Sequence, residues 1–201
     1  MDKASKHKVD LLLAVLESLG IESPTRALSV TVTADERDEA RARWRALGVT
    51  PEKPAIAVNI GARGSKRWPV DRVLDLVRGL QAEHDRPVVL LAGPEDEERL
   101  REMRPHLPDG VVVAPRLAIR AFAAFLSQAA VLVTQDTGPM HLAAAVGVPI
   151  VALLVAPRSA VFMPRGLSDR AVFTGRAPRV PVVLDAVRSV LEQPRAEQRP
   201  A

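Results

Sequence analysis

The chain has 201 residues and a formal net charge of +4, with 47% hydrophobic and 26% charged residues, which is ordinary for one soluble globular domain. It has no cysteine, and its four histidines are scattered, so disulfides and thiolate metal sites are excluded and neither a metal nor another cofactor is expected. The basic residues are mostly arginines set among acids, and aromatic residues are only 3%, so no nucleic-acid partner is expected.

The most apolar stretch, residues 142–156, is shorter than the roughly 20 residues of a membrane-spanning helix. Gly147 and Pro149 interrupt it, so it predicts a helix, a turn and a buried strand. Near the N-terminus, Asp10 and Glu17 bound an apolar segment that is too short for a signal peptide. We therefore expect a cytoplasmic protein, with at most peripheral contact at the inner face of the cytoplasmic membrane.

Residues 1–53 predict a first helix, a short strand and a charged helix. Apolar residues at helical spacing cover residues 9–19, and residues 28–32 have the composition of a short strand. Thr33 and Glu36 have capping-box spacing. The charged helix that they open is expected to be mostly exposed to solvent.

Residues 54–192 alternate short apolar runs with amphipathic segments. Strands are expected at residues 55–58, 88–91, 111–113, 131–134 and 150–155. Helices are expected at residues 70–83, 95–104, 120–128, 139–146 and 181–192. Apolar strands separated by helices are typical of a parallel sheet covered on both faces, which predicts a Rossmann-like, doubly wound α/β domain. Residues 193–201 predict a disordered tail.

Ligands of an open α/β sheet bind at the carboxyl edge of the strands, where helix N-termini offer N–H groups. The first junction of this kind covers residues 59–69. Gly61 and Ala62 would let a ligand approach the backbone, and Lys66 supplies positive charge. The alternative is a solvated turn with Trp68 packed beneath it.

The second junction, residues 92–98, carries acids in the first turn of a helix. The helix dipole favours acids there, so capping alone explains most of them. Glu95 lies nearest the strand end and is the residue that could reach a sugar hydroxyl.

The third junction, residues 131–141, combines several groups suited to a nucleotide ligand. Gly138 permits close approach, and Thr137 with the exposed amides of the helix start can bind phosphate oxygens. Asp136 can accept hydrogen bonds from a sugar hydroxyl, and His141 lies about one turn into the helix. Taken singly, such an aspartate is usually a cap and such a histidine a core residue. Their combination at this edge favours a functional site.

The string Asp-Thr-Gly-Pro-Met-His-Leu-Ala-Ala-Ala-Val-Gly-Val-Pro at residues 136–149 resembles glycosyltransferase family 9, the ADP-heptose:lipopolysaccharide heptosyltransferases. The similarity extends over residues 56–154, where residues 66–69 look like the family's lysine-containing element and residues 93–95 its acidic element. The resemblance implies a GT-B architecture of two Rossmann-like domains. This chain is similar to the C-terminal, donor-binding half, and residues 9–20 match the segment that links the halves.

The resemblance also implies residue roles, in an inverting transfer without a metal. Lys66 would contact the phosphates of an ADP-linked donor, Glu95 the ribose and Asp136 the heptose, and Lys66 and Asp136 are the expected catalytic residues. The expected donor-binding set is Gly61, Ala62, Lys66, Glu95, Leu117, Asp136, Thr137, Gly138 and His141. Residues 114–117 and 155–159 depart from the family pattern, which leaves the identity of the donor open.

The expected function is therefore that of a heptosyltransferase-like enzyme, acting on a lipopolysaccharide core or a related glycan. The family's candidate base lies in its N-terminal domain and has no counterpart upstream of Ala55. The expected partners are a nucleotide-sugar donor and either a separate N-terminal acceptor-binding domain or a second copy of this chain. Two alternatives stay open: a non-catalytic nucleotide-sugar-binding remnant and a nucleotide-sugar epimerase-like enzyme.

Overall fold

The computed structural model of the chain describes residues 7–154, 161–163, 169–173 and 179–193. Within them, six parallel strands form one sheet in the order β3-β2-β1-β4-β5-β6. The strands are β1 (Ile56–Asn59), β2 (Val88–Leu91), β3 (Val112–Val113), β4 (Val131–Gln135), β5 (Ile150–Leu154) and β6 (Arg170–Phe173). This is the strand order of a Rossmann fold, and it confirms the predicted Rossmann-like α/β class.

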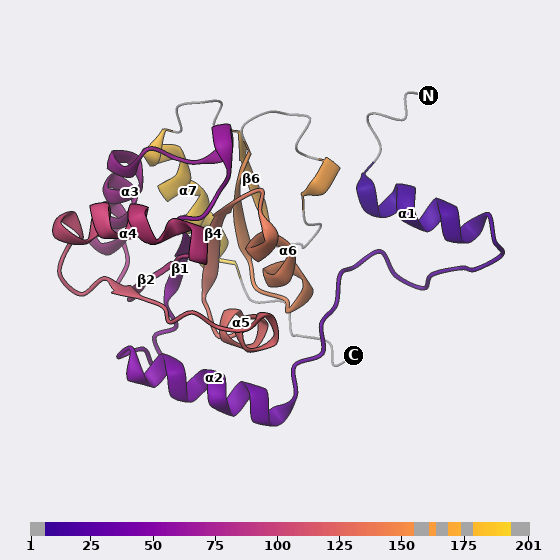
Figure 1. Cartoon of the computed structure of the whole chain (residues 1–201), viewed down its shortest axis with the longest axis horizontal. Coiled ribbons are helices and arrows are strands. Elements are labelled where there is room, and N and C mark those ends of the chain that lie inside the picture. Colours follow the sequence, from indigo (N-terminus) through magenta and orange to yellow (C-terminus); the bar gives the residue numbers. More distant parts are fainter. Residues whose placement is uncertain (1–6, 155–160, 164–168, 174–178, 194–201) are drawn as a thin grey trace.

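Helices cover both faces of the sheet (Figure 1). One face carries α3 (Val70–Glu83), α4 (Glu97–Met103) and α7 (Val180–Leu191), and the other carries α2 (Ala34–Ala46), α5 (Ile119–Leu126) and α6 (Gly138–Ala145). Successive side chains of a strand point to opposite faces, so the apolar strands supply two separate cores. The predicted helices of this region are confirmed to within a few residues.

The site lies where the connections between strands switch from one face of the sheet to the other. After β1 the chain passes to α3 on one face, and after β4, the strand next to β1, it passes to α6 on the other face. Two neighbouring strands whose connections leave toward opposite faces create a crevice at their carboxyl ends, which is where open α/β sheets bind ligands.

Helix α2 begins as predicted, with a capping box. Thr33 Oγ1 accepts a hydrogen bond from the Glu36 N–H at 3.2 Å, and Glu36 Oε2 accepts one from the Thr33 N–H at 2.9 Å. The helix is exposed except for the face that carries Ala40 and Trp44. Trp44 is 3% exposed, stacks on Phe125 of α5 with 4.1 Å between ring centroids, and donates from Nε1 to the Phe125 carbonyl at 2.8 Å. This contact fixes α2 against the domain.

The strand predicted at residues 28–32 is wrong. This segment is extended but joins no sheet, and the Val30 N–H donates to the carbonyl of Ala145, at the end of α6, at 2.9 Å. A strand needs a free sheet edge, and the edge strands here are β3 and β6, so a segment lying beside α6 has none to pair with.

The predicted linker helix forms as α1 (Lys8–Glu17), which has no buried residue and exposes Leu12 and Val15. Figure 1 shows it beside the α/β body rather than within its layers. Among the described residues, every helix is too short or too polar to cross a bilayer. The predicted tail lies outside the described residues except for Gln193, and residues 155–159 lie outside them too.

Strand β6 was not predicted. It has four residues, begins with Arg170 at the sheet edge, and follows polar residues. A short edge strand needs less apolar character than a central one, so its pattern is weak.

Candidate functional site

The floor of the crevice is held by one buried amide. Asn59, the last residue of β1, is 5% exposed. Its Nδ2 donates to Thr134 Oγ1 at 3.0 Å, to Thr137 Oγ1 at 3.2 Å and to the Gly61 carbonyl at 3.0 Å. Its Oδ1 accepts from the Gly61 N–H at 3.3 Å. The amide therefore ties the loop after β1 to the loop after β4.

An ion pair spans the same crevice. Lys66 ends the short 3-10 helix Gly64–Lys66, and its Nζ lies 2.7 Å from Asp136 Oδ2 and 3.2 Å from the Asp136 carbonyl oxygen. The Asp136 side chain is 12% exposed and that of Lys66 is 42% exposed. The structure thus joins the two residues expected to be catalytic, and a phosphate arriving here would compete with Asp136 for the ammonium.

The start of α6 is open to a ligand. Thr137 is its N-cap residue but makes no capping bond, because its hydroxyl faces Asn59 and donates to the Gln135 carbonyl at 3.2 Å. A Cβ built on Gly138 would meet no atom within 4 Å. Helix N-termini attract anions through free N–H groups and the helix dipole, so an open one beside Lys66 suits a phosphate.

His141 lies in the first turn of α6 and is half-buried. Its ring makes no hydrogen bond with any other described residue. The described part of the chain also gathers no group of three His, Asp or Glu side chains that could hold a metal ion.

A buried carboxylate holds the first and second junctions together. Asp96 is 4% exposed and accepts hydrogen bonds from the Gly93 N–H at 2.9 Å and from Arg67 Nη2 at 3.3 Å. Arg67 Nε donates in turn to the carbonyl of the buried Ala62 at 2.9 Å. A Cβ on Gly61 would lie 2.5 Å from Asp96 Oδ2, so glycine is needed at that position to admit Asp96.

Two of the predicted donor-binding residues lie away from this centre. Glu95 is exposed and accepts from Arg63 Nε at 3.1 Å, and the hydrogen bonds from Arg63 lower the pKa of this carboxyl group below its ordinary value. Leu117 is half-buried and packs on the core shared by α2, α5 and α6. Neither hydrogen-bonds to the Lys66–Asp136 pair.

Trp68 is packed beneath its loop, as the alternative interpretation of the first junction predicted. It is 3% exposed in the core beneath α3, and Arg99 of α4 donates from Nη2 to its carbonyl. Burial lowers the pKa of the Arg99 guanidinium. Trp68 therefore supports the loop that carries Lys66 and does not face a ligand.

The polar supports of the site were not predicted from the sequence. They are Asn59, Thr134, Asp96 and Arg67. One signal could have revealed the first two, because each is a polar residue near the carboxyl end of an otherwise apolar strand. The role of Asp96 had no such signal, because it depends on contact with a glycine far away in the chain.

Known proteins share this architecture. The family model for glycosyltransferase family 9 (heptosyltransferase) matches residues 1–179. A Haemophilus influenzae protein provisionally named a glycosyltransferase is 33% identical over 117 residues, which cover 56% of this chain and 34% of that protein.

Two solved structures superpose on most of the chain. A family 9 glycosyl transferase from Veillonella parvula matches with a TM-score of 0.82 and 25% identity, over 94% of this chain and 61% of that one. The Escherichia coli ADP-heptose lipopolysaccharide heptosyltransferase II matches with a TM-score of 0.67 and 24% identity, over 81% of this chain and 53% of that one. This chain thus spans about a third of the Haemophilus protein and about three fifths of the Veillonella structure. Since the family model covers most of its length, the chain belongs to glycosyltransferase family 9.

Proposed function

We propose that this chain is the donor-binding part of an inverting glycosyltransferase that takes an ADP-linked sugar such as ADP-heptose. The acceptor would be a lipopolysaccharide core or a related glycan, held by a separate acceptor-binding domain. The observation that carries the proposal is the meeting of the Lys66 ammonium with the open N-terminus of α6 in one crevice. A cation beside a helix N-terminus suits a diphosphate.

The proposed chemistry uses these groups electrostatically. The acceptor oxygen attacks the anomeric carbon, the bond from that carbon to the diphosphate oxygen breaks, and negative charge accumulates on the departing ADP. Lys66 and the N–H groups at the start of α6 would stabilise that charge. Asp136 would accept hydrogen bonds from hydroxyls of the donor sugar. The acceptor's proton would go to a base on the acceptor-binding domain.

Calorimetric titration with ADP tests the donor site. ADP has roughly 27 non-hydrogen atoms, and ~0.3 kcal/mol per atom sets a ceiling near micromolar affinity, so a dissociation constant between about 1 μM and 1 mM is expected. Lys66→Ala should weaken binding about fivefold to tenfold, because a half-exposed charged contact contributes about 1 kcal/mol. Asp136→Ala should strengthen ADP binding, because Lys66 loses its internal competitor, while binding of ADP-heptose weakens.

Lys53→Ala is the matched control. Lys53 also pairs with an aspartate, Asp85, but it precedes β1 and so lies at the opposite end of the strands from Asn59. Its loss should leave ADP affinity unchanged. A folded chain that binds no ADP, or equal losses in Lys53→Ala and Lys66→Ala, would contradict the proposed site.

A second candidate is a module that binds a nucleotide sugar without catalysis, because Lys66, Asp136 and the open start of α6 are all groups suited to binding the donor. We would add the acceptor-binding domain of a family member and supply ADP-heptose and other nucleotide sugars. Glycosylated product supports the transferase. ADP binding without product in every pairing supports the module, and isomerisation of the donor sugar alone would indicate an epimerase-like activity.

A further inference from the structure

A second hollow lies at the same edge of the sheet, beside the ends of β2 and β3. Its volume is about 270 Å³. Three arginines line it: Arg101 of α4, Arg104 just after α4, and Arg116 after β3. The rest of the lining is Glu97 and five apolar or small residues, among them Leu100 and Val113. We call it the arginine pocket.

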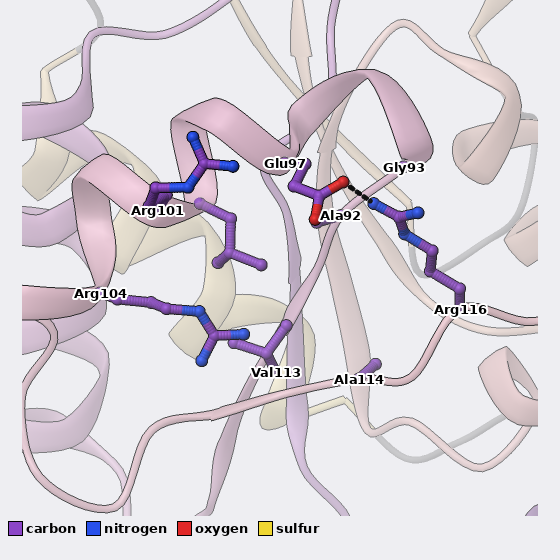
Figure 2. Close-up of a pocket in the computed structure, with 9 residues that line it drawn as sticks. Ala92, Gly93, Glu97, Arg101, Arg104, Val113, Ala114 and Arg116 are labelled. Carbon is purple, nitrogen blue, oxygen red and sulfur yellow. Dashed lines mark hydrogen bonds and ion pairs between the residues drawn. The ribbon is translucent and has the colours of Figure 1, made fainter.

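The arginine pocket has an excess of positive charge. Arg116 Nη2 lies 2.8 Å from Glu97 Oε2, and this hydrogen bond lowers the pKa of the Glu97 carboxyl group. Arg101 and Arg104 lie three positions apart, and neither side chain forms a hydrogen bond or ion pair with another described residue. Figure 2 shows these two side chains on the helical side of the pocket and Arg116 on the other, paired with Glu97. The three guanidinium charges, which persist at any physiological pH, therefore outnumber the one carboxylate of the pocket, although Glu97 also attracts Arg101 electrostatically.

We propose that the arginine pocket binds a phosphate monoester of a sugar or a nucleoside. Guanidinium groups bind phosphate oxygens in a bidentate manner, and Arg101 and Arg104 can do so without first breaking an ion pair. Leu100 and Val113 offer apolar surface to the carbon ring that carries the phosphate. The volume is just below the roughly 300–1,000 Å³ of sites for drug-sized ligands, which suits a ligand of one ring and one phosphate.

The arginine pocket is separate from the Lys66–Asp136 crevice. It lies beside β2 and β3, whereas the crevice lies between β1 and β4, and the buried Asp96 stands in the loop between them. Gly93 and Arg116 of the pocket lie close in sequence to Glu95 and Leu117, which were expected to bind the donor. The proposal rests on the proposed function if the phosphate belongs to the donor nucleotide, and is independent of it if the phosphate belongs to a separate sugar phosphate.

The first test is an NMR titration of the full 201-residue chain with ribose 5-phosphate, following the arginine Nε–Hε signals, with neutral ribose as the blank. We expect saturable shifts for the phosphate and none for ribose. Arg101→Gln and Arg104→Gln should each weaken binding about threefold to tenfold, as expected for exposed charge-assisted contacts. Glu97→Gln should strengthen binding, because it releases Arg116.

Arg41→Gln is the matched control, since Arg41 is an exposed arginine of α2 whose partner is Asp38. It should leave ribose 5-phosphate binding unchanged. The proposal is overturned if no signal saturates, or if the binding survives both Arg101→Gln and Arg104→Gln and is lost in Lys66→Ala. ADP titration of the same variants reports separately on the crevice, so failure of one site is distinguishable from failure of the other.

A second titration separates the two sources of the phosphate. If adenosine 2′,5′-bisphosphate binds more tightly than AMP, and Arg101→Gln abolishes this difference, the pocket binds a phosphate on the nucleotide itself. Binding of ribose 5-phosphate in the presence of saturating ADP assigns it to a separate phosphosugar. Either result supports the pocket as a phosphate site. The proposal is overturned if the bisphosphate binds no more tightly than AMP and ribose 5-phosphate does not bind in the presence of saturating ADP.

Discussion

Two glycines at the site should respond in opposite ways to replacement by alanine. In Gly61→Ala the new Cβ would lie 2.5 Å from Asp96 Oδ2 and 3.4 Å from Asn59 Oδ1. Asp96 is buried and held by the Gly93 N–H, so it cannot withdraw without weakening that hydrogen bond. Overpacking of this kind costs about 1–3 kcal/mol, or about 2–12 °C in Tm for a chain of this size.

In Gly138→Ala the new methyl group meets no atom within 4 Å, and the residue has ordinary helical conformation at the start of α6. Replacing glycine by alanine in a helix stabilises it by up to ~1 kcal/mol, so this variant should be as stable as the parent or slightly more so. If a diphosphate approaches the backbone of Gly138, the methyl group should nevertheless weaken ADP binding by about tenfold or more.

Urea unfolding followed by circular dichroism, together with ADP titration, measures both effects on the same samples. The reasoning about Asp96 is refuted if Gly61→Ala is as stable as the parent chain. The assignment of the α6 N-terminus is refuted if Gly138→Ala binds ADP as tightly as the parent chain. Because Gly138→Ala is expected to stay folded, which the urea unfolding checks on the same sample, a loss of ADP binding would not be due to unfolding.

Two further predictions concern stability. Trp44→Ala should lower the free energy of unfolding by about 3–5 kcal/mol, since it removes a buried ring stacked on Phe125; a loss below about 1 kcal/mol in urea unfolding would show that α2 is not docked. Burial holds the pKa of His84 below its ordinary value of about 6.5, and its Nε2 has no partner among the described residues. As the pH falls, His84 is therefore protonated in the unfolded chain before it is protonated in the folded chain, so the free energy of unfolding should decrease from about pH 7 to pH 5. In His84→Gln this decrease should be smaller. Urea unfolding at several pH values measures both.

Much of the fold was predictable because it depends on local pattern. Apolar runs bounded by helical segments located β1 to β5, and the spacing of Thr33 and Glu36 located the start of α2. The segment at residues 28–32 and strand β6 show where pattern fails, because each outcome depends on which sheet edge lies nearby. The docking of Trp44 on Phe125 likewise depends on how the helices are arranged.

The site was predictable at its junctions but not in its supports. Lys66 and Asp136 were both expected at the carboxyl edge, and the pairing of β1 with β4 brings them into contact. The expectation that Gly61 is small for the sake of a ligand did not foresee Asp96, whose carboxylate occupies that space. A contact of this kind follows only from the relative placement of two loops, which the sequence does not display.

The hydrogen bonds of the Asn59 amide limit the residue types that the chain tolerates at position 59. Its nitrogen faces three oxygen acceptors while its oxygen faces an N–H donor. Aspartate has the same shape but would turn a negatively charged oxygen toward those acceptors, and leucine would remove the donor that all three acceptors share. In a saturation library screened for folding, asparagine should therefore be strongly preferred at position 59, while the exposed Lys53, at the opposite end of β1, should accept most residues.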